Sequence, residues 1–466
     1  MEELLACLAL MLPTALGCAW VTVLVPRDTP GRLPLAWGSG TLLGILSVPL
    51  LLRFTHVLGQ PLSFTVTASL VALLCLPALW MLWRRAAPAP GVIQTPENVL
   101  GNGEKLLCAL LAALIALRLG TLGLELLWRP LYPWDATMHW ATKARVWFEY
   151  RSIVPFVPHA QWLALGGEGV FTDRHPFYPS TIPLLQVWMS LAIGKWDESL
   201  INLPWLLCLP GLGAAFYGQL RLAGAGVVTA TVFSYLLLSM PLINTHVALA
   251  GYADLFLGAT YCCALMSLHN WITRREAWLA ALTLLFTLSC LVIKNEGFFW
   301  ALSLAPALAV AFMQRREAAK LVFLLGLVGV LLLLVLPREM QVAGHTLQQL
   351  APAFNPAALS GLIKSIWLHD SWHLFGYLAL MLLPLGLLLP GALTRQYLGL
   401  TAALASAVGA FLFLFLFTGF GWGAATLTAV GRLSVQLAPG IVFLCALLFE
   451  ELLRRGRLLS PPSTRL

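Results

Sequence analysis

One acidic side chain stands where it could do chemistry at a membrane surface. Asp135 lies in the run Tyr-Pro-Trp-Asp-Ala (132–136), shortly after a long apolar stretch ends near position 128. A carboxylate held where lipid meets water, among Trp134, His139 and Trp140, can have a raised pKa and accept a proton as a general base. The sequence therefore predicts Asp135 as the base of a reaction at this surface.

Cationic side chains on the same predicted face suit a phosphate group. A departing phosphate develops negative charge, which positively charged side chains stabilise. The candidates at the ends of apolar stretches or in long loops are Arg432, Lys294, Arg174 and Arg338. Arg118 is a further candidate inside an apolar stretch, where an arginine is costly and indicates either a function or a structural ion pair.

Further polar residues are candidates for a second acid or for groups that bind an acceptor. They are Glu168, Asp173, His175, Asp254, Glu296 and His139. Most have structural alternatives: Glu168 and Asp173 as solvated loop residues, and Asp254 as a group that stabilises the N-terminus of a helix. Lys294 and Glu296 also fit a surface ion pair between two helices.

The sequence predicts no metal site. His369 and His373 are four residues apart, as in some helical metal sites, and Asp370 lies between them, with His345 earlier in the same loop. The neighbouring Trp367 and Trp372 favour a belt at the membrane interface instead. All nine cysteines lie in apolar stretches without metal-ligand or disulfide spacing. No cofactor is predicted, and assistance by a divalent metal is left as an alternative.

Composition indicates a polytopic membrane protein built of helices. Hydrophobic residues make up 59% of the 466 positions and charged residues 10%, far less charge than a soluble protein carries. The apolar runs are continuous, which favours helices over an alternating β-barrel pattern. The net charge of +8 comes from single or paired basic residues between these runs, so it predicts membrane orientation and argues against nucleic-acid binding.

Thirteen stretches are long and apolar enough to be read as membrane spans. They cover residues 3–25, 34–57, 63–83, 105–128, 199–220, 226–243, 252–272, 277–293, 297–313, 320–337, 373–390, 396–418 and 434–453. A shorter apolar segment, 180–194, fits either a full span or a helix in the outer interface. Basic residues fall on one side of the membrane only if this segment does not cross, which places the N-terminus outside and the C-terminus inside.

The same topology predicts the domain organisation. Residues 1–103 form a three-helix membrane unit that ends in a linker rich in Pro, Gly and Asn, and residues 104–466 form the catalytic membrane domain. Three long loops, 129–198, 338–372 and 419–433, lie on the outer face. Functional residues concentrate on such loops.

Several short motifs resemble the GT-C superfamily of membrane glycosyltransferases, which use polyprenyl-phosphate-linked sugars. The run 132–136 is similar to the first-loop aspartate of that superfamily, and Asp-Arg-His-Pro-Phe-Tyr-Pro (173–179) to the segment that closes this loop. Gly-Tyr-Ala-Asp (251–254) resembles a Tyr-Ala-Asp motif, and Lys-Asn-Glu-Gly (294–297) a turn of the bacterial branch. Gly431 and Arg432, followed by Gln-Leu-Ala-Pro (436–439), resemble the start of a late span.

The resemblance implies a GT-C-like fold and an enzyme of the inner (plasma) membrane with its active site facing the periplasm or the outside. Such an enzyme would move a sugar from a polyprenyl-phosphate donor to a glycan, lipid or protein acceptor. Asp135 would serve as base and the Arg and Lys residues would clamp the lipid phosphate. One isolated carboxylate predicts a single displacement with inversion at the anomeric carbon. The alternatives are a secondary transporter or flippase, and a polymerase or ligase of lipid-linked polysaccharide.

Overall fold

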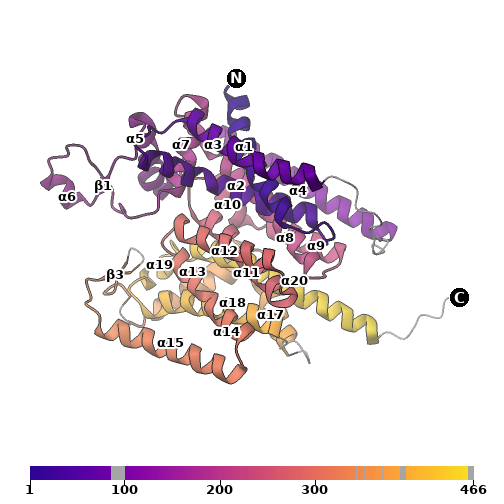
Figure 1. The fold of residues 1–466 in the computed structure, drawn as a ribbon. Helices are drawn as coiled ribbons and strands as arrows, with labels where there is room; N and C mark the ends of the chain where they lie inside the picture. The colour runs from indigo at the N-terminus through magenta and orange to yellow at the C-terminus, as the bar shows by residue number, and fades with distance from the viewer. Residues whose placement is uncertain (86–99, 343–344, 351–352, 370, 389–394, 460–466) are drawn as a thin grey trace. The chain divides into compact units, whose positions relative to one another are not determined.

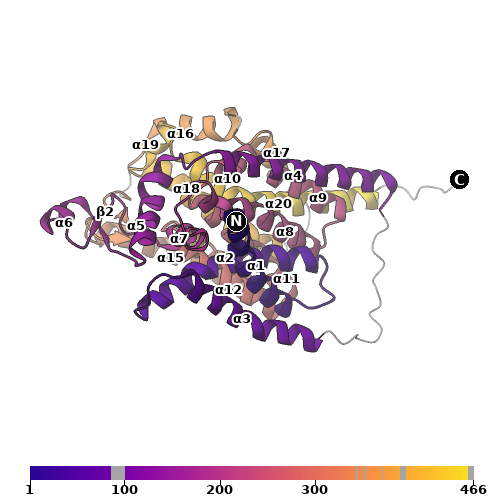
Figure 2. The ribbon, with the colours of Figure 1, turned by 90° about the horizontal axis from the view of Figure 1, so that it is seen from above.

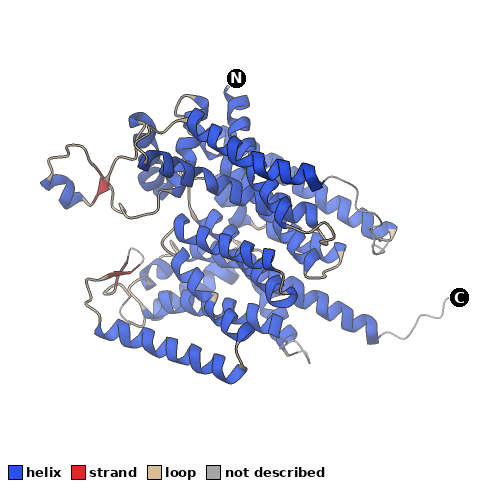
Figure 3. Ribbon diagram, in the orientation of Figure 1, coloured by secondary structure: helices blue, strands red, loops and turns tan. Residues whose placement is uncertain are grey.

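The computed structural model describes residues 1–85, 100–342, 345–350, 353–369, 371–388 and 395–459. Most of these residues are helical (Figure 3). The strands described are two residues long: β1 (Phe156–Val157) pairs in parallel with β2 (Phe171–Thr172), and β3 (Gln341–Val342) pairs antiparallel with β4 (His345–Thr346). The expectation of an all-α protein is confirmed.

Eight of the described helices are long and apolar enough to cross a membrane. Seven of them are α1 (Glu2–Leu24), α2 (Arg32–Val57), α3 (Phe64–Arg85), α4 (Asn102–Trp128), α11 (Asp254–Arg274), α18 (Arg395–Phe417) and α20 (Val430–Leu459). The eighth joins η2 (Leu200–Asn202) and α8 (Leu203–Leu222). In α4 only 6% of the most apolar window is buried, and an exposed apolar helix of this length needs lipid around it. The chain is therefore a multi-pass membrane protein.

The remaining predicted spans correspond to shorter or broken helices and to the helix at 315–335, which is not among the eight. A ninth span results if the bent pair α9 (Val227–Leu238) and α10 (Pro241–Ala248) counts as one. Residues 277–313 form α12 (Ala277–Ile293), α13 (Gly297–Ser303) and α14 (Ala305–Phe312). Residues 315–387 include α15 (Arg315–Val335) and α17 (Phe375–Leu387). The total of thirteen spans therefore stays a prediction.

The chain divides into two compact units, which are described separately. Unit 1 comprises Met1–Gly218, Ser234–Ser239 and Ile243–Phe256; unit 2 comprises Gln219–Phe233, Met240–Leu242 and Leu257–Leu466. This division differs from the one expected at residue 103, because α1 and α2 pack against α7 (Thr181–Ile193), a helix of the first long loop. The linker expected at 86–103 lies largely outside the described residues. A separate role for the first three helices stays a prediction.

The core of unit 1 contains α7, the segment whose crossing the sequence left open. All thirteen of its residues are buried, and the indole of Trp188 donates a hydrogen bond to the carbonyl oxygen of Ala9 at 2.8 Å. A helix of this length spans about 20 Å, short of the roughly 30 Å of a bilayer core. The helix is buried on every side within the unit, and whether it crosses the membrane stays a prediction.

The rest of the first long loop consists of short elements. They are η1 (Ala136–Ala141), a π-helix, α5 (Thr142–Tyr150), the strand pair β1–β2, and α6 (His159–Ala164) between the strands. In both ribbon views α6 projects from the helices of unit 1 (Figures 1 and 2). Trp147 and Phe148 are buried against α7.

Unit 2 is a helical bundle in which α14 and α19 (Gly421–Ala425) pack against α18, and α17 packs against α20. The second long loop contributes α16 (Pro356–Ile363) and η3 (Lys364–Leu368). Buried polar side chains pair across the bundle: the indole of Trp300 donates to Oε1 of Gln436 at 2.5 Å, and the hydroxyls of Tyr261 and Ser303 are 2.6 Å apart.

Candidate functional site

Asp135 stands directly before the π-helix η1 and is half-buried, whereas the next residue, Ala136, is fully buried. A π-helix is rare and is most often found near functional sites, because its wider turn redirects side chains. Here it places His139 and Trp140 in the interior of unit 1 while Asp135 keeps access to solvent. A base that must meet a substrate requires this access.

A buried ion-pair network lies beneath Asp135. Oδ1 of Asp173 is 2.5 Å from Nδ1 of His139, and its Oδ2 is 2.6 Å from Nζ of Lys143. The backbone N–H of His175 donates to Asp173 Oδ1 at 3.1 Å, and Lys143 donates to the backbone oxygen of His175 at 2.7 Å. Lys143 is 2% exposed and Asp173 is 7% exposed. The network therefore fixes the end of the loop, at 173–175, to the helix that follows Asp135.

The network determines the charge of its members. Burial by itself would raise the pKa of Asp173, but hydrogen bonds from His139 and Lys143 and the charge of Lys143 lower that pKa to about 2. Burial lowers the pKa of Lys143, and its bond to Asp173 opposes this effect. Burial, together with the charge of His139, lowers the pKa of His175, while Asp173 and Asp135 act in the opposite direction. Asp173 is thus ionised at neutral pH, and His175 is neutral.

The depressed pKa of Asp173 predicts a loss of stability in acid. Its folded pKa of about 2 lies below the ordinary value of 3.8, so the stabilisation is complete above about pH 4 and is lost as pH falls toward 2. The linked free energy is about 2 kcal/mol. The thermal midpoint in detergent should fall more steeply between pH 4 and 2 for wild type than for Asp173→Asn. Parallel curves for the two proteins would contradict this assignment.

Aromatic rings cover the network. The ring of Tyr178 stacks on Trp140 at 4.9 Å between centroids and on His175 at the same distance, and the ring of His139 meets His175 edge-on at 4.8 Å. These rings exclude water from the ion pair, which strengthens its electrostatic interaction. His139, His175 and Tyr178 therefore form a rigid wall beside Asp135.

A third sequence segment, 251–254, packs against Ala136, the residue that follows Asp135. Gly251 has a φ of +105° and packs so closely on Ala136 that an added Cβ would lie 2.6 Å from the Cβ of Ala136. The indole of Trp205 donates to the backbone oxygen of Tyr252 at 2.7 Å and so fixes the turn, after which α11 begins at the buried Asp254. Only glycine combines this φ with this close approach. Three motifs that are distant in sequence thus meet in unit 1.

The other candidates of unit 1 lie outside this cluster. Arg174 and Glu168 are exposed. Arg118 is exposed on α4, and Glu125, which lies on the same helix face, forms an i,i+4 ion pair with Arg129 at 2.8 Å. The structural ion pair considered for Arg118 therefore does not involve Glu125.

In unit 2, Lys294 and Glu296 occupy the break between α12 and α13. Lys294 is extended (φ −157°, ψ 153°) and 2% exposed, and its Nζ is 2.9 Å from Oε1 of Glu296. Gly297 permits the break, because a Cβ there would overlap the backbone carbonyl of Cys290. The pair is therefore buried, and the expected alternative of a surface pair is not what the structure has.

The remaining cations of unit 2 are Arg432 and Arg338. Arg432 is half-buried in the first turn of α20, where the helix dipole disfavours a positive charge unless an anionic group is near. It adjoins Leu433, which lines one cavity together with Glu296. Arg338 is exposed after α15. Unit 2 thus brings the 294–297 turn and the start of α20 to the same region.

Among the described residues, no group of three or more His, Cys, Asp and Glu side chains could hold a metal. The helical spacing considered for His369 and His373 does not occur, because η3 ends at Leu368, α17 begins at Phe375, and His373 has a φ of +48°. Asp370 lies outside the described residues.

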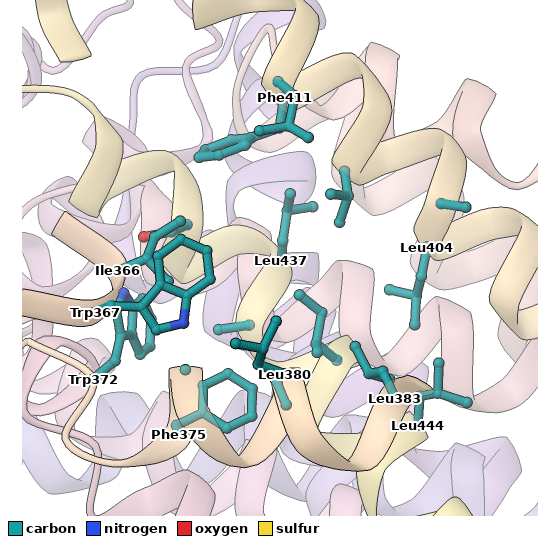
Figure 4. A pocket seen from close by; sticks show the side chains of 18 of the residues that line it. Ile366, Trp367, Trp372, Phe375, Leu380, Leu383, Leu404, Phe411, Leu437 and Leu444 are labelled. Carbon is teal, nitrogen blue, oxygen red and sulfur yellow. The ribbon is translucent and has the colours of Figure 1, made fainter. Parts of the chain in front are cut away.

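Unit 2 also holds an elongated apolar cavity of about 410 Å³ between α17, α18 and α20. Trp367 and Trp372 lie on one side of it, Leu404 and Leu444 on the other, and Phe411 at one end (Figure 4). Its size is within the usual range of ligand pockets, and its lining suits a hydrocarbon chain.

Sequence reasoning missed the part that Lys143 plays. Its ammonium is buried against Asp173, and Lys143 is not among the candidates named from the sequence. Lys143 is four residues after His139, so one helix face carries both side chains, and this spacing was the available signal. Nothing in the local pattern points to their shared partner, 34 residues from His139.

Comparisons of the chain with known protein families, with curated proteins and with solved structures found no match.

Proposed function

We propose that the protein is a membrane glycosyltransferase that moves a sugar from a polyprenyl-phosphate donor to an acceptor, with inversion. The observation that supports it best is the meeting of segments 135–140, 173–178 and 251–254 around the half-exposed Asp135. These are three of the segments in which the sequence resembles GT-C enzymes. We place the protein in the inner (plasma) membrane, with the reaction on the outer side.

Asp135 is the general base of this proposal. It accepts the proton of the acceptor hydroxyl as that oxygen attacks the anomeric carbon and the lipid phosphate departs. Asp173 is unsuited to this role, because Lys143 and His139 occupy both of its oxygens and lower its pKa to about 2. Asp173 and His139 instead position the helix that carries Asp135, and His175 lies beside it as a neutral group.

Unit 2 supplies the lipid-binding groups of the proposal. The cavity of about 410 Å³ takes part of the isoprenoid chain of the donor, since its lining offers dispersion contacts and almost no polar group. Lys294 and Arg432 are the cations assigned to the donor phosphate. Arg338 of unit 2, and Arg174 and Arg118 of unit 1, are exposed and take a secondary part in attracting the anionic donor.

Narrowing the cavity should weaken binding of long-chain donors. Ala379 lines it on α17, and Ala379→Phe would fill space that the chain needs. We expect the KM for a long polyprenyl-phosphate donor to rise at least tenfold, with little change for a donor of one or two isoprene units. Leu385→Phe, on the same helix but outside the cavity lining, is the matched control. Equal effects of Ala379→Phe on both donors would remove the cavity from the proposal.

A product assay tests the proposed function itself. Purified protein in nanodiscs is incubated with a panel of polyprenyl-phosphate hexoses and with cell-envelope extract, and products are identified by mass spectrometry. We expect a new glycosylated species and free polyprenyl phosphate in equal amounts. Absence of both with every donor would reject the proposal.

A transporter is the second candidate, and one observation favours it. The helix pair α9 and α10 bends by 55° between Leu238 and Pro241, and broken helices line the substrate sites of many transporters. Uptake of a lipid-linked sugar into proteoliposomes, without any transfer product, would favour this function over the first.

A further inference from the structure

A second cavity of unit 2 is apolar except for one carboxylate. It measures about 260 Å³ and lies between α13, α18, α19 and the start of α20. Aromatic rings form much of its wall, among them Phe299, Trp300, Phe415, Phe420 and Trp422. Glu296 is the single ionisable residue in its lining.

The carboxylate of Glu296 is half satisfied. Oε1 forms the ion pair with Lys294 at 2.9 Å, whereas Oε2 is buried and has no hydrogen-bond partner. A buried acceptor without a partner costs free energy, and native structures rarely keep one without a reason. Trp300 cannot serve as donor, because its indole N–H is used by Gln436.

The composition of the wall limits which molecule could supply the missing donor. A hexose would bury several hydroxyls against carbon and leave them without hydrogen bonds. A hydrocarbon would fit the wall but leave Oε2 of Glu296 unsatisfied. A molecule with an apolar body and one hydroxyl fits the apolar wall and also supplies a donor for Oε2 of Glu296. The bilayer that surrounds a membrane protein contains such molecules.

We propose that this aromatic cavity binds a hydroxylated lipid, whose apolar chain packs against the rings while its hydroxyl donates to Oε2 of Glu296. The site is distinct from the cavity assigned to the donor chain, although Phe411 lines both. A binding measurement tests it without any enzymatic turnover, so its outcome is independent of the proposed glycosyl transfer.

The test is photolabelling of the full-length protein in nanodiscs with a diazirine-bearing long-chain alcohol. Cross-links are mapped by mass spectrometry, and unlabelled octadecanol and octadecane compete for the site. We expect labels within residues 296–300 and 410–433, and competition by the alcohol at least tenfold stronger than by the alkane. Equal competition by the two, or labels confined to other segments, would overturn the proposal.

Three variants and one control distinguish the contribution of the hydrogen bond from that of the space in the cavity. Glu296→Gln keeps an acceptor oxygen and should keep the preference for the alcohol. Lys294→Met with Glu296→Leu removes both charges of this ion pair together and should make alcohol and alkane compete equally. Ala410→Phe should abolish labelling by filling the cavity, while Ala402→Phe on the same helix, outside the cavity lining, should not. If the double variant fails to fold, the wild-type competition and Ala410→Phe still decide the matter.

Discussion

Replacement of Asp135 by Asn should lower the transfer rate by about two to four orders of magnitude, which is the usual contribution of a positioned general base. The amide has nearly the same shape but cannot accept the proton of the attacking hydroxyl. Asp135 is half-exposed and asparagine keeps nearly the same shape, so the substitution should leave folding intact. The measurement is turnover of a polyprenyl-phosphate sugar at saturating donor, beside binding of the same donor.

A loss of turnover without a loss of donor binding would be specific for a general base. Donor affinity should change less than threefold, because Asp135 is assigned to the acceptor and not to the lipid phosphate. Glu149→Gln is the matched control, since Glu149 is exposed in the same loop on α5 and has no assigned role. Unchanged turnover in Asp135→Asn, or an equal loss in Glu149→Gln, would end the assignment of the base.

Hydropathy predicted the long helices well because lipid imposes a simple rule on them: a helix that crosses the bilayer needs about 20 consecutive apolar residues. The spans expected at 105–128 and 396–418 correspond to α4 (Asn102–Trp128) and α18 (Arg395–Phe417). The rule does not detect helix breaks. The span expected at 297–313 divides near Leu304, where Pro306 occupies the first turn of α14, and the one at 226–243 bends before Pro241. Proline cannot donate the backbone hydrogen bond that would continue the preceding helix.

The candidate site was partly predictable, for a related reason. Motifs placed at helix ends identified His139, Asp173, His175 and the 251–254 turn, which meet in unit 1. The burial of Lys143 could not be derived, because a lysine beside aromatic residues in a loop ordinarily marks the interface. Lys143 is buried because its partner Asp173 lies close to it. The strand pair β1–β2, which ends one residue before Asp173, brings that carboxylate there. Such long-range pairing leaves no local pattern.

The pairing of Lys143 with Asp173 predicts the largest effect on stability. Lys143→Met keeps the aliphatic stem but leaves the Asp173 carboxylate buried and less compensated, at a cost of about 3–5 kcal/mol. Hydrogen exchange of the amides in residues 136–150 should report this cost as protection factors lower by roughly two to three orders of magnitude, at about 1.4 kcal/mol per factor of ten. Lys195→Met, which removes an exposed ion pair with Glu2, should change protection by less than about 1 kcal/mol.

A double variant tests whether the buried ion-pair network only stabilises the loop or also positions Asp135. Lys143→Met with Asp173→Leu removes both buried charges, so most of the lost protection should return. Turnover should nevertheless stay low, because the hydrogen bonds that Asp173 accepts from His139 and from the backbone N–H of His175 are gone, and these hold the wall beside Asp135. Recovery of turnover together with stability would mean that the network only holds the loop together. Continued loss of turnover in a well-folded loop would show that it positions Asp135 for the reaction.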